Sequence, residues 1–467
     1  MSEVLIAPVD ADVPVRLLWE AETAGWLAEV GGLTASLAAV QGFTGKAGAL
    51  LVVPRAEGGV ERVAFGLGAR AEAMTLRGLP GRLPAGDYRL EGTAGLDPTQ
   101  VALAWALGSY AYDRYKPRNL DDRARLVTPE GADLAEALRI GHAAALARDM
   151  VNTPAGDLGP LQIETIAREV AEQHGAAITV ITGAELLEAN YPAIHAVGRA
   201  AAPDRQPRLI ELTWGDPGAP VVALVGKGVT FDTGGLNLKP GGGMRLMKKD
   251  MGGAAHALAV ARMVMGAQLP VRLVLLLPVV ENAVSGDAVR PGDVLSSRKG
   301  LHIEIGNTDA EGRLILADAL TRAGEHGPVL TVDFATLTGA ARVALGPQLP
   351  PLFTDDEAWA AEVLAASAAV GDPLWRMPLW DGYEDSLGSD IADLTNDSDA
   401  WAQAGSVTAA LFLRRFKPAT GGWAHLDVMA WNPRGRPGWP TGGELQGARA
   451  VYEALKRRFP SGAARNG

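Results

Sequence analysis

Residues 221–235 read VVALVGKGVTFDTGG, and this stretch decides the fold class. Five aliphatic residues lead into a glycine-rich turn that carries a lysine and an aspartate. Further short aliphatic runs of strand length follow at Val271–Pro278, Leu301–Ile305 and Leu330–Phe334. Helical patterns separate these runs, at Gly252–Met265, Leu314–Ala323 and Trp359–Val370. Apolar strands that alternate with helices predict an α/β fold with a mainly parallel sheet, covered by helices on both faces.

The chain upstream of this pattern predicts a second, smaller α/β domain. Residues 1–127 hold short apolar runs and Ala-rich helical stretches, without a cluster of catalytic residue types. Residues 128–150 form one Ala/Leu-rich amphipathic pattern that predicts a linking helix. It should end near Asn152-Thr153-Pro154, because the residue before a proline is pushed out of helical geometry. We therefore expect a C-terminal domain over residues 151–467.

Composition excludes several classes of protein. The 467 residues carry 43 Lys+Arg and 54 Asp+Glu, a net charge of −11, which argues against nucleic acid as the main partner because such binding needs a concentrated positive field. The absence of cysteine excludes disulfides, thiolate catalysis and Cys-based metal sites. The start of the chain does not read as a secretory signal, and no apolar run approaches the length of a membrane span. We expect a cytoplasmic protein without a membrane partner.

Three segments that we place at strand ends are chemically unusual: 226–243, 247–255 and 306–314. They concentrate carboxylates among glycines, namely Asp232, Asp250, Asp309 and Glu311. Four carboxylates at one sheet edge would repel one another unless positive charge lies between them. Lys227, Lys239 and Arg313 supply part of that charge, and a pair of divalent ions would supply the rest. Oxygen ligands without cysteine suit Mn²⁺, Mg²⁺ or Zn²⁺.

Each segment alone has a simpler interpretation. A single Asp in a Gly-rich turn is most often a turn or N-cap residue, and Asp250 precedes a helical pattern. Gly226-Lys227 suggests a phosphate-binding loop, but position 221 is Val where that motif needs Gly, and Gly228 replaces its Ser/Thr. We therefore reject the phosphate-binding loop.

Taken together, the motifs resemble a known family. GKGVTFDTGGLNLKP (226–240), MKKDMGGAA (247–255) and NTDAEGRL (307–314), in this order, closely resemble the signatures of the leucyl aminopeptidases, the M17 family of cytosolic two-metal peptidases. The resemblance extends to residues 152–154, 281–294, 335–340, 404–411 and 423–427. It thus spans most of residues 150–430, and the N-terminal third shows only general similarity.

The resemblance implies a set of site residues. The tighter metal site would be held by Lys227, Asp232, Asp250 and Glu311. Asp232 and Glu311 would bridge to a second, exchangeable site that Asp309 completes. A lysine that coordinates metal must be neutral, and a buried dication can depress its pKa far enough. Lys239 would stabilise the oxyanion, and Arg313 would hold a bicarbonate ion that serves as general base.

The implied activity is release of the N-terminal amino acid from peptides, with a leucine-type preference, by a water activated between two Mn²⁺ or Zn²⁺ ions. The substrate's free amine would bind one metal, and the enzyme would assemble as a homohexamer. The pocket for the first side chain would involve Met247, Thr336, Leu337 and Gly339. This chain departs from the family after Asp427: common members continue with an Ala-Gly pair, whereas residues 428–433 read VMAWNP. That segment helps to close the specificity pocket in the family.

Two other functions remain open on the sequence. A two-metal phosphoesterase would use the same physics, although it would more naturally show His ligands and a basic phosphate clamp. An inactive scaffold or nucleic-acid accessory protein could retain the fold, although every motif residue is intact here. Activity on a phosphoester without peptidase activity would favour the first, and salt-sensitive DNA binding without peptidase activity would favour the second.

Overall fold

The computed structural model describes residues 4–9, 12–70, 72–117, 119, 123–397 and 403–461. The chain divides into two compact units, one formed by Met1–Ala145 with Pro433–Thr441 and the other by Leu146–Asn432 with Gly442–Gly467. The boundary falls inside helix α4 (Leu134–Asn152). In the described part of the chain, no helix is both long enough and apolar enough to cross a bilayer.

The first unit is built on a six-stranded sheet with the order β1-β6-β5-β2-β4-β3, in which only the β4–β3 pair is antiparallel. Its strands are β1 (Leu5–Ile6), β2 (Val13–Trp19), β3 (Leu50–Pro54), β4 (Val60–Gly68), β5 (Gly86–Leu90) and β6 (Ala124–Val127). Its helices are α1 (Glu20–Val30), α2 (Gly32–Gln41) and α3 (Pro98–Gly108). Helix α3 begins where Asp97 accepts the Gln100 N–H at 2.8 Å and Pro98 occupies the first turn.

The second unit contains a larger sheet with the order β16-β15-β18-β14-β9-β11-β8-β7, to which β10 adds by pairing with β11. These strands are β7 (Ala177–Thr182), β8 (Arg208–Trp214), β9 (Val221–Gly226), β10 (Gly228–Asp232), β11 (Arg272–Asn282), β14 (Leu330–Ala335), β15 (Pro351–Thr354), β16 (Trp375–Arg376) and β18 (Gly422–Asp427). The central strands β18, β14, β9 and β11 run parallel, and antiparallel pairs lie toward the edges. The prediction of a mainly parallel sheet is confirmed for this centre.

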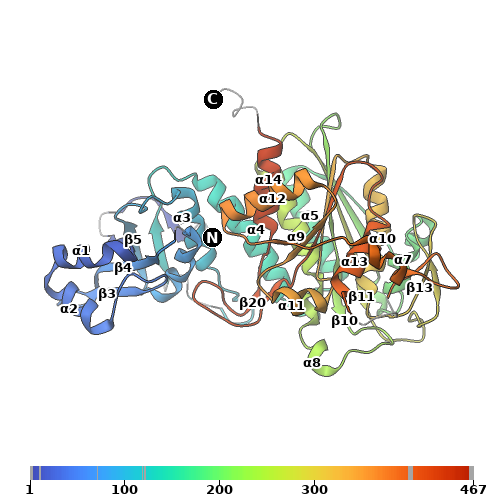
Figure 1. Cartoon of the computed structure of the whole chain (residues 1–467), viewed down its shortest axis with the longest axis horizontal. Helices are drawn as coiled ribbons and strands as arrows, with labels where there is room; N and C mark the ends of the chain where they lie inside the picture. The colour runs from blue at the N-terminus through green and yellow to red at the C-terminus, as the bar shows by residue number, and fades with distance from the viewer. Residues whose placement is uncertain are drawn as a thin grey trace. The chain divides into compact units, whose positions relative to one another are not determined.

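Helices cover both faces of this sheet, as Figure 1 shows, with α5, α9 and α14 on one side and α7, α10 and α13 on the other. The helices of the unit, besides α4, are α5 (Pro160–His174), α6 (Glu185–Glu188), α7 (Pro192–Gly198), α8 (Gly241–Met244), α9 (Gly252–Gly266), α10 (Glu311–Glu325), α11 (Gly339–Leu345), α12 (Glu357–Val370), α13 (Gly405–Arg414) and α14 (Ala448–Arg458). Successive residues of β9 point to opposite faces, and Val222, Ala223, Leu224 and Val225 are all fully buried. This two-sided burial explains why the strand reads as a continuous aliphatic run.

Two elements differ from the sequence-based expectation. The run Leu301–Ile305 forms β13 (His302–Glu304), which belongs to a separate three-stranded sheet with β12 (Val294–Ser296) and β17 (Leu394–Thr395). The segment around Asp250 is not a strand-end loop but a 3₁₀ helix, η6 (Met247–Met251), that leads directly into α9. The aliphatic pattern does not specify which sheet a short strand joins, since long-range pairing decides that. A last pair of strands, β19 (Trp431–Asn432) and β20 (Gly442–Gly443), forms a small ribbon.

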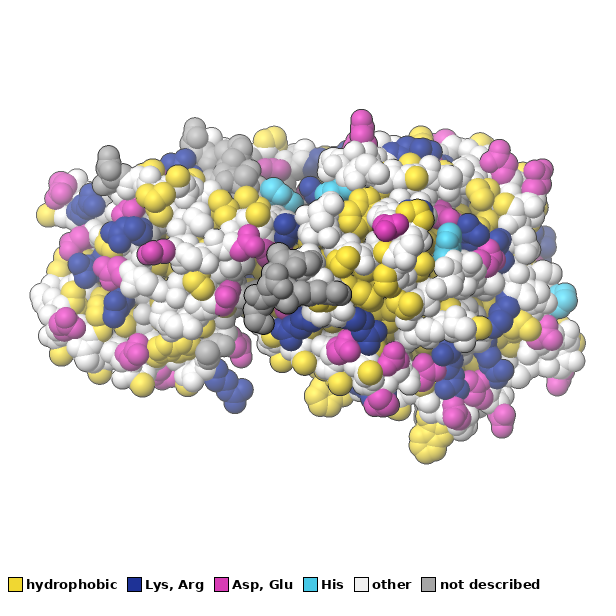
Figure 2. All heavy atoms as spheres, turned by 90° about the horizontal axis from the view of Figure 1, so that it is seen from above, with side chains coloured by type: hydrophobic (Ala, Val, Ile, Leu, Met, Phe, Trp, Pro, Cys, Tyr) yellow, Lys and Arg dark blue, Asp and Glu magenta, His cyan; other side chains and the backbone are white. Residues whose placement is uncertain are grey.

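Acidic and basic side chains are both scattered over the face shown in Figure 2.

Candidate metal centre

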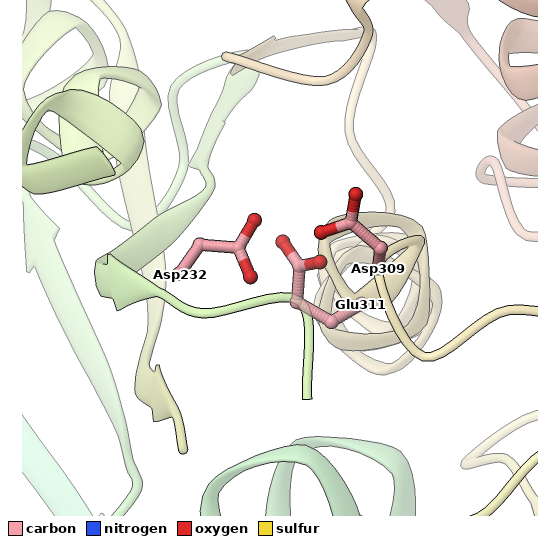
Figure 3. A group of neighbouring side chains, drawn as sticks. All are labelled: Asp232, Asp309 and Glu311. Carbon is pink, nitrogen blue, oxygen red and sulfur yellow. The ribbon is translucent and has the colours of Figure 1, made fainter. Parts of the chain in front are cut away.

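Three carboxylates from two segments of the chain face one another in the second unit (Figure 3). Asp232 ends β10, Asp309 lies in the loop before α10, and Glu311 is the first residue of that helix. One ligand oxygen from each lies within 4.8 Å of the others. Asp232 and Glu311 are buried, and Asp309 is partly exposed. The structure therefore brings together the predicted bridging carboxylates and the ligand predicted to complete the second site.

The β10–β11 pairing holds Asp232 in place. Asp232 lies opposite Asn282, after an irregularity in the register of the two strands. Its Oδ1 accepts hydrogen bonds from the Asn282 side-chain amide and from the Gly234 N–H, both at 2.8 Å. Gly234 has φ +87° and approaches closely, because a Cβ there would lie 3.0 Å from Asp309 Oδ1. One oxygen of Asp232 is thus fixed by neutral donors, and the other, Oδ2, faces a cation, the ammonium group of Lys239, at 2.8 Å.

Lys227 lies in the short connection from β9 to β10 and points into the same cluster. Its Nζ is 2.8 Å from Asp250 Oδ2, 3.0 Å from Glu311 Oε1 and 3.2 Å from the Thr336 carbonyl oxygen, to which it donates. Burial alone would lower the pKa of Lys227, but the carboxylates of Asp250 and Glu311 outweigh it and raise the pKa. Without another cation the lysine is therefore held as an ammonium ion.

Asp250, in η6, completes this side of the cluster. The Thr336 hydroxyl donates to Asp250 Oδ1 at 2.8 Å. Burial opposes ionisation of Asp250, but Lys227 and Lys249 overcome it and lower the pKa. Asp250 does not cap α9, whose N-cap residue is Met251. The simpler interpretation of Asp250 as a helix cap is therefore wrong.

Glu311 shows most clearly that the nearby lysines do not neutralise all the carboxylates of the cluster. Both of its carboxylate oxygens are buried, and within the described residues neither accepts a hydrogen bond. Burial, and next the charge of Asp232, raise the pKa of Glu311 to about 8. Burial and Asp232 likewise raise the pKa of Asp309. Hard and borderline divalent ions bind buried carboxylate oxygens such as these, together with an amine such as that of Lys227. The residues present therefore fit the predicted metal pair.

The two predicted catalytic side chains border the cluster. Lys239 Nζ is 2.8 Å from Asp232 Oδ2 and also pairs with Asp309. Arg313, nearly buried in the first turn of α10, donates from Nη1 to the Asn396 carbonyl oxygen at 2.5 Å. Its buried Nε has no hydrogen-bond partner in the part of the chain that the structure describes. Arg313 therefore keeps a free donor for an acceptor such as a small anion.

The predicted pocket residues are only partly brought together. Thr336 contacts the cluster through both its hydroxyl and its carbonyl group. Leu337 packs against the hydrophobic core and donates its N–H to Asp427 Oδ1 at 3.0 Å. Met247 is half-buried in η6, and Gly339 is exposed at the start of α11. Among the described residues, no hydrogen bond joins Met247 to the other three.

Sequence reasoning missed three residues near the centre. Asn282 fixes Asp232, and its signal was a polar residue at the end of an otherwise apolar strand. Asp427 holds the chain between β14 and α11 by accepting the Thr338 hydroxyl at 2.7 Å. Lys249 is buried beside Asp250, and burial lowers its pKa to about 8, so it is mainly protonated at pH 7. A second lysine next to a candidate ligand was the available signal.

Comparisons with known proteins match both parts of the chain. Residues 145–451 match the family described as "Cytosol aminopeptidase family, catalytic domain", and residues 13–129 match "M17 aminopeptidase, N-terminal domain". The chain belongs to the cytosol aminopeptidase family. Family membership confirms the resemblance drawn from the motifs and makes the protein a hydrolase of the metal-dependent aminopeptidase class.

Individual relatives are similar to this chain along nearly its whole length. A probable cytosol aminopeptidase of Geobacter sp. (strain M21) is 37% identical and covers 92% of this chain and 93% of its own. The crystal structure of the cytosol aminopeptidase from Coxiella burnetii has a TM-score of 0.92 and 43% identity, covering 98% of this chain and 100% of the other. The bottromycin maturation enzyme BotP in complex with Mn has a TM-score of 0.85 and 37% identity, covering 96% and 100%.

Proposed function

We propose that this aminopeptidase removes the first residue from peptides at a centre of two divalent ions, Mn²⁺ or Zn²⁺, within the predicted catalytic domain of residues 151–467. The observation that carries the proposal is the buried carboxylate cluster, above all Glu311, whose two buried oxygens accept no hydrogen bond among the described residues and have only Lys227 as a neighbouring ion-pair partner. Lys227, Asp232, Asp250 and Glu311 would hold one ion, and Asp309 would complete the second site with Asp232 and Glu311. When bound, the ions supply Lewis acidity: they lower the pKa of water and polarise the scissile carbonyl.

The side chains around the cluster supply the rest of the chemistry. Lys239, which borders the cluster beside Asp232, would donate to the oxygen on which negative charge develops as the carbonyl becomes tetrahedral. That charge exists only as the reaction proceeds, so the interaction stabilises the transition state more than the bound peptide. Arg313 would hold bicarbonate through its free Nε–H, and an anion held there would supply a general base.

The proposal includes a substrate preference, a location and an assembly. The leucine-type preference is supported by the family resemblance, with Met247, Thr336, Leu337 and Gly339 around the first side chain. A cytoplasmic location is supported by the names of the relatives and by the cysteine-free composition. A homohexamer is supported by the resemblance alone.

The proposal is tested by metal depletion and restoration. We expect the chelated enzyme to lose hydrolysis of leucine p-nitroanilide, and added Mn²⁺ or Zn²⁺ to restore it with two ions bound per chain. Glu311→Gln should lower kcat/KM by about 100-fold or more, since loss of a ligand should cost at least as much as loss of an outer-shell partner. Glu325→Gln is the matched control, because this residue lies on the same helix and pairs with Arg298 and Arg322 instead. Activity that does not depend on metal would overturn the proposal.

A further inference from the structure

Asn396 is a fully buried polar residue to which the proposed mechanism gives no role. It follows β17 in the small sheet of β12, β13 and β17, where its N–H donates to the Glu304 carbonyl oxygen at 2.9 Å at the end of the β13–β17 pairing. Its side chain reaches the loop 306–310, which lies between β13 and α10. A buried amide side chain needs partners for its oxygen and for its two N–H hydrogens, and it finds them in this loop.

The side chain of Asn396 binds the backbone of the loop that carries Asp309. Its Oδ1 accepts the N–H groups of Gly306 at 2.9 Å and Asn307 at 3.2 Å, and its Nδ2 donates to the carbonyl oxygens of Asn307 at 2.8 Å and Ala310 at 3.4 Å. These backbone groups belong to neither a helix nor a strand, so regular structure does not supply their partners. One buried side chain therefore holds the loop at both of its ends.

These contacts continue to the predicted ligand Asp309. The Asn307 Oδ1 accepts the Asp309 N–H at 2.8 Å, so the residue that Asn396 holds by its backbone positions Asp309 by its side chain. Another side of the loop is held separately, because the Thr308 N–H donates to Asn237 Oδ1 at 2.9 Å. Without the Asn396 side chain, the loop would stay attached at Thr308 and could shift at Asp309.

The main chain of Asn396 contacts the predicted anion-binding residue. Its carbonyl oxygen accepts a hydrogen bond from Arg313 Nη1 at 2.5 Å. A Cβ on Gly306 would lie 3.3 Å from both Thr395 Oγ1 and Asp397 Cβ, so the loop also packs closely against the residues on either side of Asn396. One buried residue thus joins the loop of the second ion site to the arginine that would hold the anion.

We propose that Asn396 is a positioning residue of the metal centre, which holds the loop 306–310 so that Asp309 completes the second, exchangeable ion site. This inference rests on the proposed two-ion function and adds to it a residue that touches neither ion. Loss of such an outer-shell partner typically costs 10- to 100-fold in metal affinity. The first ion should depend on Asn396 much less, because three of its four proposed ligands lie in other segments of the chain.

The test is a titration of Mn²⁺ into the metal-depleted enzyme, followed by calorimetry, in which the two ions bind in separate steps. Asn396→Ser shortens the side chain beyond reach of the loop and keeps the main-chain carbonyl group that Arg313 contacts. We expect the affinity of the weaker step to fall by about 10- to 100-fold. The affinity of the tighter step should stay within about twofold of the wild-type value.

A matched control and a second variant complete the design. Ser297→Ala removes another buried hydrogen bond of the same small sheet, in which the Ser297 hydroxyl donates to the Leu301 carbonyl oxygen at 2.9 Å. It should lower the thermal stability of the protein and leave both steps of Mn²⁺ binding within about twofold of wild type. Should Asn396→Ser fail to fold, Asn396→Asp, which has the same size and loses only the N–H donors, should still weaken the second step by about threefold or more.

The possible failures are distinct. An Asn396→Ser enzyme that binds both ions as tightly as the wild type overturns the inference. Equal weakening of the two steps also overturns it, since Asn396 would then only stabilise the fold. In both cases the wild type still binds two ions and hydrolyses leucine p-nitroanilide, so the proposed function stands. A wild type that does not bind two ions would overturn the proposed function, and the inference with it.

Discussion

Gly312 shows at the scale of one residue how tightly the centre is built. A Cβ at this position would lie 2.4 Å from Lys227 Cε and 2.7 Å from Lys227 Nζ. Both distances are shorter than real non-bonded contacts between such atoms. A side chain at position 312 would therefore force Lys227 out of the cluster. The glycine in NTDAEGRL is therefore required by the approach of the lysine rather than by a turn, since its own backbone is helical.

We accordingly predict that Gly312→Ala lowers kcat/KM by about 100-fold or more while the protein still folds, because alanine favours a helix. Titration of metal into the depleted variant should show weaker binding of the tighter ion. Gly324→Ala in the same helix is the control: its nearest contact would be 3.3 Å, with Pro418 Cα, and the enzyme should remain active. Full activity in Gly312→Ala would show that catalysis does not require Lys227 at its present position.

At the scale of the element, helix ends are fixed by acids from elsewhere in the chain. Asp372 follows α12, yet its carboxylate accepts the N–H groups of Gly447 at 3.0 Å and Arg449 at 2.9 Å, at the start of α14. The side chain is almost fully buried, so no water can replace it. A buried cap should therefore contribute more to stability than an exposed one.

We predict that Asp372→Ala lowers the free energy of unfolding by about 3 kcal/mol, because it leaves buried donors unsatisfied. Asp97→Ala, which removes the exposed cap of α3, should cost about 1 kcal/mol. Urea denaturation of both variants beside the wild type measures the difference. Equal losses would show that burial of the acceptor does not matter.

Some elements and site residues could be predicted from the sequence, and others could not. The parallel strands, the helices between them and the carboxylate cluster follow from apolar runs and from motif order. The placement of β13 in a separate sheet does not, because a three-residue strand carries no signal of its partner. Asn282 and Lys249 also escaped prediction, since their importance lies in contacts between distant segments. The domain boundaries at residues 127 and 150 and the roles of the site residues stay predictions.

At the scale of the whole molecule, stability should depend on pH through a buried histidine. His256 is fully buried in α9, with Nδ1 against the Gly252 carbonyl oxygen at 2.7 Å and Nε2 accepting the Gln446 N–H at 2.9 Å. Burial lowers the pKa of His256 to about 4, although Gly252, Asp372 and Glu444 favour the protonated form. The folded protein therefore keeps this ring neutral well below pH 7.

Unfolding restores an ordinary histidine pKa of about 6.5, so between that value and about pH 4 the unfolded chain binds a proton that the folded chain does not. Stability from this residue is complete above pH 6.5 and is lost as the pH falls toward 4, by at most about 3 kcal/mol. Urea denaturation of metal-depleted protein from pH 7 to 4 should show this loss, and His256→Gln should show a shallower one despite lower stability at pH 7. Parallel pH curves for the two proteins would show that His256 is not the group that titrates.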